Sequence, residues 1–327
     1  MSKPLSFTGP FHVSLQEFVH LKRSIGYKFD SGALHRFDRF TGERYPTADR
    51  LTKDIVLDWC RKRPYEASAN RTSRASIIRQ FGVYLDSLGC QAYILPKGAY
   101  PKGPNYVPHI YTEDELQRFF AQTDSCRYCV ECPHRHVIMP VFFRMIYTCG
   151  LRVSEARMLK VGDVDLNEGI LTISQAKKDN DRLVPMAESL LKRCRTYADV
   201  VHSSPDEHAY FFPARNEAPM TLMNVYHNFR KFLWQAGISH GGRGKGPRIH
   251  DFRHTYACHC LKRWAKQGKD LSAYLPLLKT YLGHDSFHET AYYLRLTADV
   301  FTDITIRVEG KYPDLLPKLE GAADAPH

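Results

Sequence analysis

Apolar residues in the first part of the chain recur every three or four positions, the spacing of one face of a helix. This pattern predicts four or five short helices, with periodic stretches at about Ser14–Gly26, Leu34–Phe40, Ile55–Cys60 and Ser73–Leu88. The segment that follows contains Pro96, Pro101, Pro104 and Pro108, and proline interrupts regular helices. The sequence therefore predicts a helical domain over residues 1–90 and an extended linker over residues 91–108.

The remainder, residues 109–327, has mostly helical patterning. Thr112, followed by three acidic residues, is typical of a helix start. Further helices are expected up to Cys149, from about Ser154 to Leu159, and again after Leu190, apart from the glycine-rich stretch Gly237–Gly246. Between them, Ile170–Ser174 and Arg182–Met186 alternate like two strands around a polar turn. The predicted fold class is mainly α (α+β), with one small antiparallel sheet in a mostly helical second domain.

Chain length is consistent with two domains, and the net charge indicates a candidate binding partner. The chain has 327 residues, enough for two domains, and 43% hydrophobic residues exclude a disordered protein. Its formal net charge is +11, of which residues 1–108 carry +8, from 17 Lys and Arg against 9 Asp and Glu. A folded basic protein favours polyanions such as nucleic acid. We expect the front domain to contact DNA phosphates.

Cysteine usage and hydropathy predict an intracellular protein. Nine cysteines without a secretory leader favour reduced thiols over a disulfide framework. The longest apolar stretch, near Val137 to Tyr147, is broken by Pro140 and Arg144, so no membrane segment is expected. We expect a cytoplasmic, nucleoid-associated location.

Phosphodiester chemistry without a metal needs cations around the phosphate, a nucleophile, and an acid for the leaving oxygen. The helical stretches contain no acidic cluster of the kind that a two-metal nuclease uses. Arg152 follows a predicted helix break, and His250 and Arg253 lie three residues apart, on one face of a helix. A histidine at 284 and a tyrosine at 293 follow. Each signal is weak alone, and the set is specific.

The second domain resembles the tyrosine recombinases, the lambda-integrase-like or phage integrase family. The resemblance covers roughly residues 109–297, and its four motifs occur in the family's order. They are Gly150-Leu151-Arg152-Val153-Ser154-Glu155, Lys177 five residues before Arg182-Leu183-Val184-Pro185, His250-Asp251-Phe252-Arg253-His254-Thr255, and Leu282-Gly283-His284 nine residues before Tyr293. It implies that the front domain is the core-binding domain and that the two domains form a C-shaped clamp on DNA.

The resemblance also implies a mechanism. The catalytic residues would be Arg152, Lys177, His250, Arg253, His284 and Tyr293. The arginines would hold the scissile phosphate, and the lysine would protonate the departing 5′ oxygen. The first histidine would assist proton transfer, the second would donate a hydrogen bond to the phosphate, and the tyrosine would attack phosphorus. Glu155 would support the loop around Arg152.

Several assignments have competing interpretations. Lys178 competes with Lys177 at the hairpin tip, where Ala176 replaces the family's usual glycine. Tyr292 competes with Tyr293 as the nucleophile, although neighbours on a helix point about 100° apart and only one can serve. His284 is also consistent with a buried histidine that only caps a helix.

The implied enzyme is a site-specific DNA recombinase or integrase that works through a 3′-phosphotyrosyl intermediate, for a mobile element. It would need no metal, ATP or other cofactor. Its partners would be double-stranded DNA, further protomers in a homo- or hetero-tetramer on that DNA, and accessory recombination proteins. The segment after residue 297 would dock on a neighbour or on its own protomer.

Two other functions and one metal site stay open. A type IB topoisomerase would use the same tyrosine chemistry to relax supercoils, and an accessory protein with a decayed site would bind DNA without cutting it. Separately, four residues offer thiolate and imidazole ligands for a structural zinc ion, at tight spacing: Cys126, Cys129, Cys132 and His134.

Overall fold

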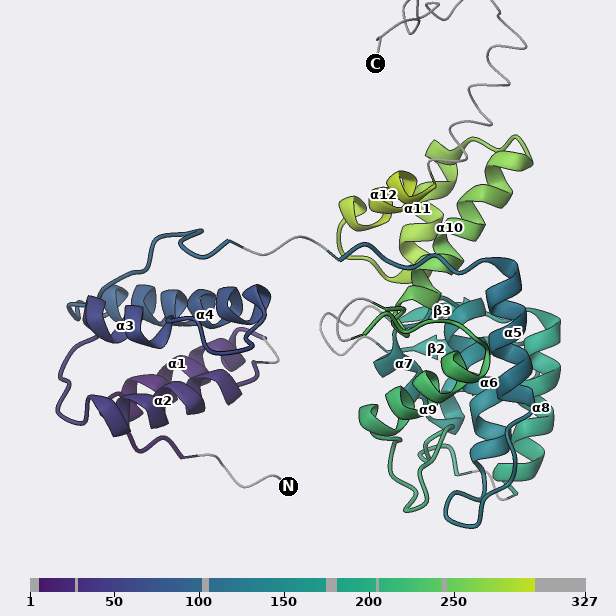
Figure 1. The fold of residues 1–327 in the computed structure, drawn as a ribbon, viewed down its shortest axis with the longest axis horizontal. Helices are drawn as coiled ribbons and strands as arrows, with labels where there is room; N and C mark the ends of the chain where they lie inside the picture. Colours follow the sequence, from purple (N-terminus) through teal and green to yellow (C-terminus); the bar gives the residue numbers. More distant parts are fainter. Residues whose placement is uncertain are drawn as a thin grey trace, which may run out of the picture. The chain divides into compact units, whose positions relative to one another are not determined.

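The computed structural model describes residues 6–26, 29–101, 106–174, 181–203, 206–242 and 246–297. The chain divides into two compact units, Met1–Val107 and Pro108–His327. Figure 1 labels their helices and strands along the chain. The first unit contains α1 (His12–Ser24), α2 (Gly32–Arg44), α3 (Lys53–Trp59) and α4 (Ser68–Ser87). The second contains α5 (Glu113–Asp124), α6 (Arg135–Thr148), α7 (Val153–Met158), η1 (Val161–Asp163), β1 (Val164–Asp165), β2 (Ile170–Ile173), β3 (Arg182–Pro185), α8 (Glu188–Val201), α9 (Leu222–Gln235), α10 (Asp251–Lys266), α11 (Leu271–Leu282) and α12 (Phe287–Leu296).

The first unit is a bundle of four helices around an aromatic core. Phe18, Phe37 and Phe81 come from α1, α2 and α4 and are buried, and the Phe81 ring contacts each of the other two edge to face. The described residues of the stretch after α4, up to 101 and from 106, form no helix or regular strand, as its prolines predict, but the first part of this stretch packs on the unit. The Tyr93 amide donates to the Leu51 carbonyl at 2.7 Å, and Leu95 is buried in the same core.

The second unit is built around α6, which is apolar on most sides and packs against α5, α8 and α10. Thr112 begins α5 as predicted. Its hydroxyl accepts from the Glu115 amide, and the Glu115 carboxylate accepts from the Thr112 amide, which forms a capping box. The cap fixes the point at which the chain enters this unit.

The predicted small antiparallel sheet is present, with strand order β1-β2-β3. In the β2–β3 pair, Ile170 lies opposite Pro185 and Ile173 opposite Arg182. The tip that joins them, residues 175–180, lies outside the described residues, and so do the candidate lysines Lys177 and Lys178.

The sequence predicts helix almost throughout the region after Leu190, and this is wrong for residues 202–203 and 206–220. That stretch contains isolated bridges, Lys160 to Tyr210 and Pro213 to Pro219. The two prolines of the second bridge explain the difference, because proline removes a helical hydrogen bond.

The last three helices, α10, α11 and α12, share a separate apolar cluster that includes Leu261, Leu278 and Leu282. In Figure 1 they lie together at one end of this unit. Gly283 ends α11 in the left-handed conformation, at φ +64°, and turns the chain into α12. Residues 298–327, with the predicted docking segment, lie outside the described residues. Among the described helices, none has both the length and the apolar character needed to cross a membrane.

Candidate functional site

Arg152 lies at the start of α7, immediately after a sharp backbone turn. Gly150 has φ +60°, a conformation that favours glycine, and it lets the chain turn from the end of α6 into α7. The Glu155 carboxylate accepts from the Arg152 amide at 2.8 Å and from its Nη1 at 2.8 Å. Arg152 Nη2 donates to the Gly283 carbonyl at 3.0 Å. The side chain is thus held between the start of α7 and the end of α11.

Arg253, on α10, is held by the same two segments. Its Nη1 donates to the Gly150 carbonyl at 2.8 Å and its Nη2 to the Leu282 carbonyl at 2.6 Å. The residue is 1% exposed, and burial, together with the nearby Arg152 charge, lowers its pKa to about 10. Arg253 therefore remains charged at neutral pH. Because the two arginines donate to the consecutive carbonyls of Leu282 and Gly283, their guanidinium groups share one small region.

A third arginine, Arg182 on β3, supports this region and was not among the predicted site residues. Its Nη1 and Nη2 donate to the two oxygens of Glu155 at 3.1 and 2.8 Å, and its Nε donates to the Tyr281 carbonyl at 3.0 Å. Burial alone raises the pKa of Glu155, but Arg182 and Arg152 outweigh it, so the carboxyl pKa lies below its ordinary value. Glu155 therefore carries a negative charge that fixes two cations.

Tyr293 and His284 lie against each other at the junction of α11 and α12. Tyr293 is 2% exposed, and its ring stacks on that of His284 with centroids 5.8 Å apart. Burial raises the pKa of the Tyr293 phenol, and the neighbouring Arg253 guanidinium opposes that rise. Tyr292 is less buried than Tyr293.

His284 is buried and hydrogen-bonded within the fold, as its structural interpretation predicts, and it also contacts Tyr293. Its Nδ1 is 2.8 Å from the Thr290 hydroxyl. Burial, then the charges of Arg253 and Arg152, lower its pKa to about 3, so the ring is neutral at pH 7. The two interpretations of this residue are therefore compatible.

His250 immediately precedes α10 and is exposed. Its ring lies edge to face with that of His254, one turn along the helix, with centroids 4.7 Å apart. Partial loss of solvent, with the Arg253 and Arg152 charges, lowers the pKa of His250 to about 4. His254 in turn lies 5.5 Å from the Tyr293 ring. Sequence reasoning gave His254 no role.

Five of the six predicted site residues thus lie in the described part of the second unit. They come from four segments that are far apart in the sequence: the start of α7, α10 and its first cap, the turn after α11, and α12. The cluster combines a buried and a partly exposed guanidinium group, neutral imidazoles and a buried phenol. Such a set can bind a phosphate between guanidinium groups and present a hydroxyl nucleophile to it.

The proposed zinc ligands do not form a metal site. Within the described residues, no three His, Cys, Asp or Glu side chains are grouped so as to hold an ion. Cys129 instead donates to the Glu131 carboxylate at 2.6 Å. The spacing of these residues is compatible with zinc, but the short loop does not turn their side chains toward one point.

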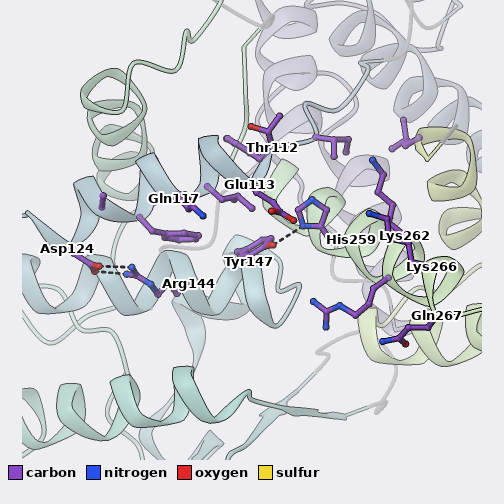
Figure 2. A pocket seen from close by; sticks show the side chains of 17 residues that line it. Thr112, Glu113, Gln117, Asp124, Arg144, Tyr147, His259, Lys262, Lys266 and Gln267 are labelled. Atoms are coloured by element: carbon purple, nitrogen blue, oxygen red, sulfur yellow. Dashed lines mark hydrogen bonds and ion pairs between the residues drawn. The ribbon is translucent and has the colours of Figure 1, made fainter. Parts of the chain in front are cut away.

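A separate hollow of about 1310 Å³ lies between α5, α6 and α10, and Figure 2 shows its lining. Across it, the Tyr147 hydroxyl and His259 Nδ1 are 2.9 Å apart, and Arg144 pairs with Asp124. None of the five predicted site residues that the structure describes lines this hollow. The candidate site is therefore a packed cluster and not the open cavity.

In a comparison with protein families, residues 110–299 match the model of the phage integrase family. Two Sinorhizobium fredii proteins with an ascribed integrase/recombinase function align over most of their length. One, y4rB, is 28% identical over 93% of this chain and 98% of its own, and the other, y4rE, is 32% identical over 88% and 92%. Tyrosine recombinase XerA of Thermococcus kodakarensis is 27% identical over 61% of this chain and 62% of its own.

Solved structures share the fold at low sequence identity. XerH site-specific recombinase, bound to its difH substrate before cleavage, matches with a TM-score of 0.58 and 18% identity, over 81% of this chain and 75% of that one. The Tn1549 transposon integrase, in complex with a circular intermediate DNA, matches with a TM-score of 0.58 and 16% identity, over 86% and 94%. The expected fold and enzyme class are confirmed: this chain belongs to the phage integrase family and is a tyrosine-type site-specific recombinase.

Proposed function

We propose that this protein cuts and rejoins double-stranded DNA through a covalent 3′-phosphotyrosyl bond to Tyr293. The observation that carries the proposal is the shared anchoring of two cations beside this phenol. Arg152 and Arg253 donate to the adjacent carbonyls of Gly283 and Leu282, and the Arg253 charge acts on the Tyr293 phenol. A phosphate that meets both guanidinium groups is then within reach of the tyrosine.

In this proposal each side chain has one task. The two arginines stabilise the charge that accumulates on the oxygens of the pentacoordinate phosphorus. Tyr293 attacks phosphorus, and Lys177 protonates the departing 5′ oxygen. His284, held by the Thr290 hydroxyl at Nδ1, donates a hydrogen bond to the phosphate from its other ring nitrogen. The phosphotyrosyl bond conserves the energy of the phosphodiester, so a 5′ hydroxyl from another strand can reverse the step without ATP.

The wider assembly follows from strand exchange. Exchange between two duplexes needs four active tyrosines, so we propose a tetramer on DNA, of identical or related protomers, with residues 298–327 as the docking segment. Basic residues of the first unit would contact phosphates and position the protein without selecting a sequence. The integrase names of the full-length relatives favour a role in a mobile element. Its DNA substrate would place the enzyme at the nucleoid, in the cytoplasm.

The test begins by finding the substrate. Purified protein is incubated with sheared genomic DNA of its source, denatured with detergent and captured, and the covalently attached DNA is sequenced. A nicked duplex with the recovered sequence then traps the intermediate, because the short product strand diffuses away. We expect an adduct that survives denaturation with the native protein and with Tyr292→Phe, and none with Tyr293→Phe, which should still bind the duplex in a mobility-shift assay. EDTA should leave adduct formation unchanged.

Other outcomes select other functions. Relaxation of a supercoiled plasmid without exchange between two sites would indicate a type IB topoisomerase. Binding without any adduct would indicate an accessory protein. An adduct that persists in Tyr293→Phe would refute the assignment of the nucleophile, and an EDTA-sensitive adduct would refute a reaction without a metal.

A further inference from the structure

The buried position of Tyr293 raises the question of where its proton goes. The phenol must lose this proton as it attacks, but the residue is 2% exposed and burial raises its pKa. The Arg253 guanidinium beside it has only donors and cannot accept a proton. The site therefore needs a base in contact with Tyr293 and a route from that base to solvent.

His254 has the position that such a base requires. It follows Arg253 on α10, and its ring lies 5.5 Å from the Tyr293 ring, tilted by 60°. Its Nδ1 is buried and has no hydrogen-bond partner. A buried polar atom without a partner is rare in folded proteins and often has a functional reason.

A path outward continues from His254 to His250. His250 caps the start of α10, one turn before His254, and the two ring centroids are 4.7 Å apart. Along this path exposure increases, from the buried tyrosine through the partly buried His254 to the exposed His250. The three rings therefore connect the phenol with solvent.

We propose that His254 accepts the phenolic proton of Tyr293 during attack and passes it to solvent by way of His250. The inference rests on the proposed function, since it requires Tyr293 to be the nucleophile. In the step, the Tyr293 O–H bond breaks and an N–H bond forms on the neutral His254 ring. The phenolic oxygen bonds to phosphorus, and the 5′ oxygen leaves with a proton from Lys177. No oxidant, reductant or further reactant is needed.

The charges around His254 explain how this weak base gains strength during the reaction. Burial, then electrostatic interactions with His250 and Arg253, lower the pKa of His254 to about 3 in the free protein. Tyr293 and His284 face it from α12 and the preceding turn. A DNA phosphate bound by Arg152 and Arg253 adds negative charge next to these cations. The pKa of His254 then rises, because a nearby anion favours the protonated ring.

The neighbouring histidines fit this task less well. His284 also contacts the Tyr293 ring, but its Nδ1 is already bonded to the Thr290 hydroxyl. The His250 ring contacts His254, which lies between it and Tyr293, so His250 is placed to pass the proton from His254 to solvent. His254 remains the imidazole with both a ring contact to the nucleophile and an unpartnered buried nitrogen.

The experiment measures single-turnover adduct formation on the nicked duplex defined above, between pH 6 and 9. His254→Gln keeps a polar side chain of similar length but cannot accept a proton at these pH values. We expect its rate at pH 7 to fall by about 100-fold, within the range for loss of a general base. The loss should shrink as pH rises, because hydroxide replaces the missing base.

A second arm changes the nucleophile. Replacing Tyr293 with 3,5-difluorotyrosine lowers the phenol pKa and should restore much of the rate of His254→Gln while changing the native enzyme little. His259→Gln, on the same helix but facing the separate hollow, is the matched control and should cleave at the native rate. A purely structural role for His254 predicts instead a loss that is equal at every pH and is not rescued by fluorination.

The outcomes separate this inference from the proposed function. Native cleavage by His254→Gln, or a pH-independent loss without rescue, would overturn the role of His254 and leave Tyr293 as the nucleophile. If the native protein forms no adduct that depends on Tyr293, both proposals are wrong.

Discussion

The pair of Glu155 and Arg182 provides a quantitative test of how the cluster is held together. Their side chains are 11% and 6% exposed, and both Glu155 oxygens accept from Arg182. Glu155→Gln removes the charge with little change in shape and leaves Arg182 as a buried cation with a weakened partner. Breaking a buried pair in this way costs about 3–5 kcal/mol. Because the glutamine oxygen can still accept one bond, we expect a loss near about 3 kcal/mol in the free energy of unfolding.

The same pair fixes the direction of a pH effect. The pKa of Glu155 in the folded protein lies below its ordinary value of 4.5, so its stabilising contribution is complete above that value. The contribution is lost as pH falls through the folded pKa. Stability of the native protein should therefore decline in acid more steeply than that of Glu155→Gln.

Urea denaturation followed by circular dichroism measures these changes, and hydrogen exchange of amides in α7 and β3 assigns them to the second unit. Arg182→Met and the double variant complete a thermodynamic cycle, in which we expect a coupling of about 2 kcal/mol or more. Asp114→Asn is the matched control, since the Asp114–Arg118 pair is exposed and should contribute less than about 1 kcal/mol. Additive single losses, or a loss no larger than that of Asp114→Asn, would refute the reasoning.

Two further substitutions test the backbone turn before Arg152 and the hydrogen bond that holds His284. Gly150→Ala should destabilise the protein by about 3 kcal/mol and slow adduct formation. The reason is that φ is +60° at this position and the new Cβ would lie 2.8 Å from Leu282 Cδ2. Unchanged stability in urea would contradict this. Thr290→Val should leave His284 Nδ1 without its partner, which costs about 1–3 kcal/mol, and should slow adduct formation about tenfold. Thr280→Val, which removes an exposed hydroxyl, is the control for that variant, and equal effects of the two would show that the His284 bond has no special role.

Much of the fold could be predicted from the sequence because its signals are local. The cap at Thr112 and the alternation of β2 and β3 depend on neighbouring residues, and both lead to elements that the structure contains. The motifs with Arg152 and Arg253 also indicated the family. The contacts that join these motifs are non-local. The bonds from Arg253 to the carbonyls of Gly150 and Leu282, and from Arg152 to that of Gly283, follow from packing that no short segment encodes.

Arg182 and His254 show two ways in which sequence reasoning missed a supporting residue. Arg182 was quoted only as part of the motif that follows Lys177, without a role of its own. Its alternation places it on the buried face with Val184, while Leu183 is exposed, and an inward arginine requires an acid such as Glu155. His254 adjoined a quoted motif, and its spacing of four from His250 already placed both on one helix face.

The most direct test of the central claim is to locate the DNA attachment by mass spectrometry. After nuclease digestion, trypsin should release residues 280–295 as one peptide, which contains Tyr281, Tyr292 and Tyr293. Fragmentation of that peptide identifies which tyrosine carries the nucleotide phosphate. We predict the added mass on Tyr293 alone. The same mass on Tyr281, on Tyr292 or on a different peptide would contradict the account.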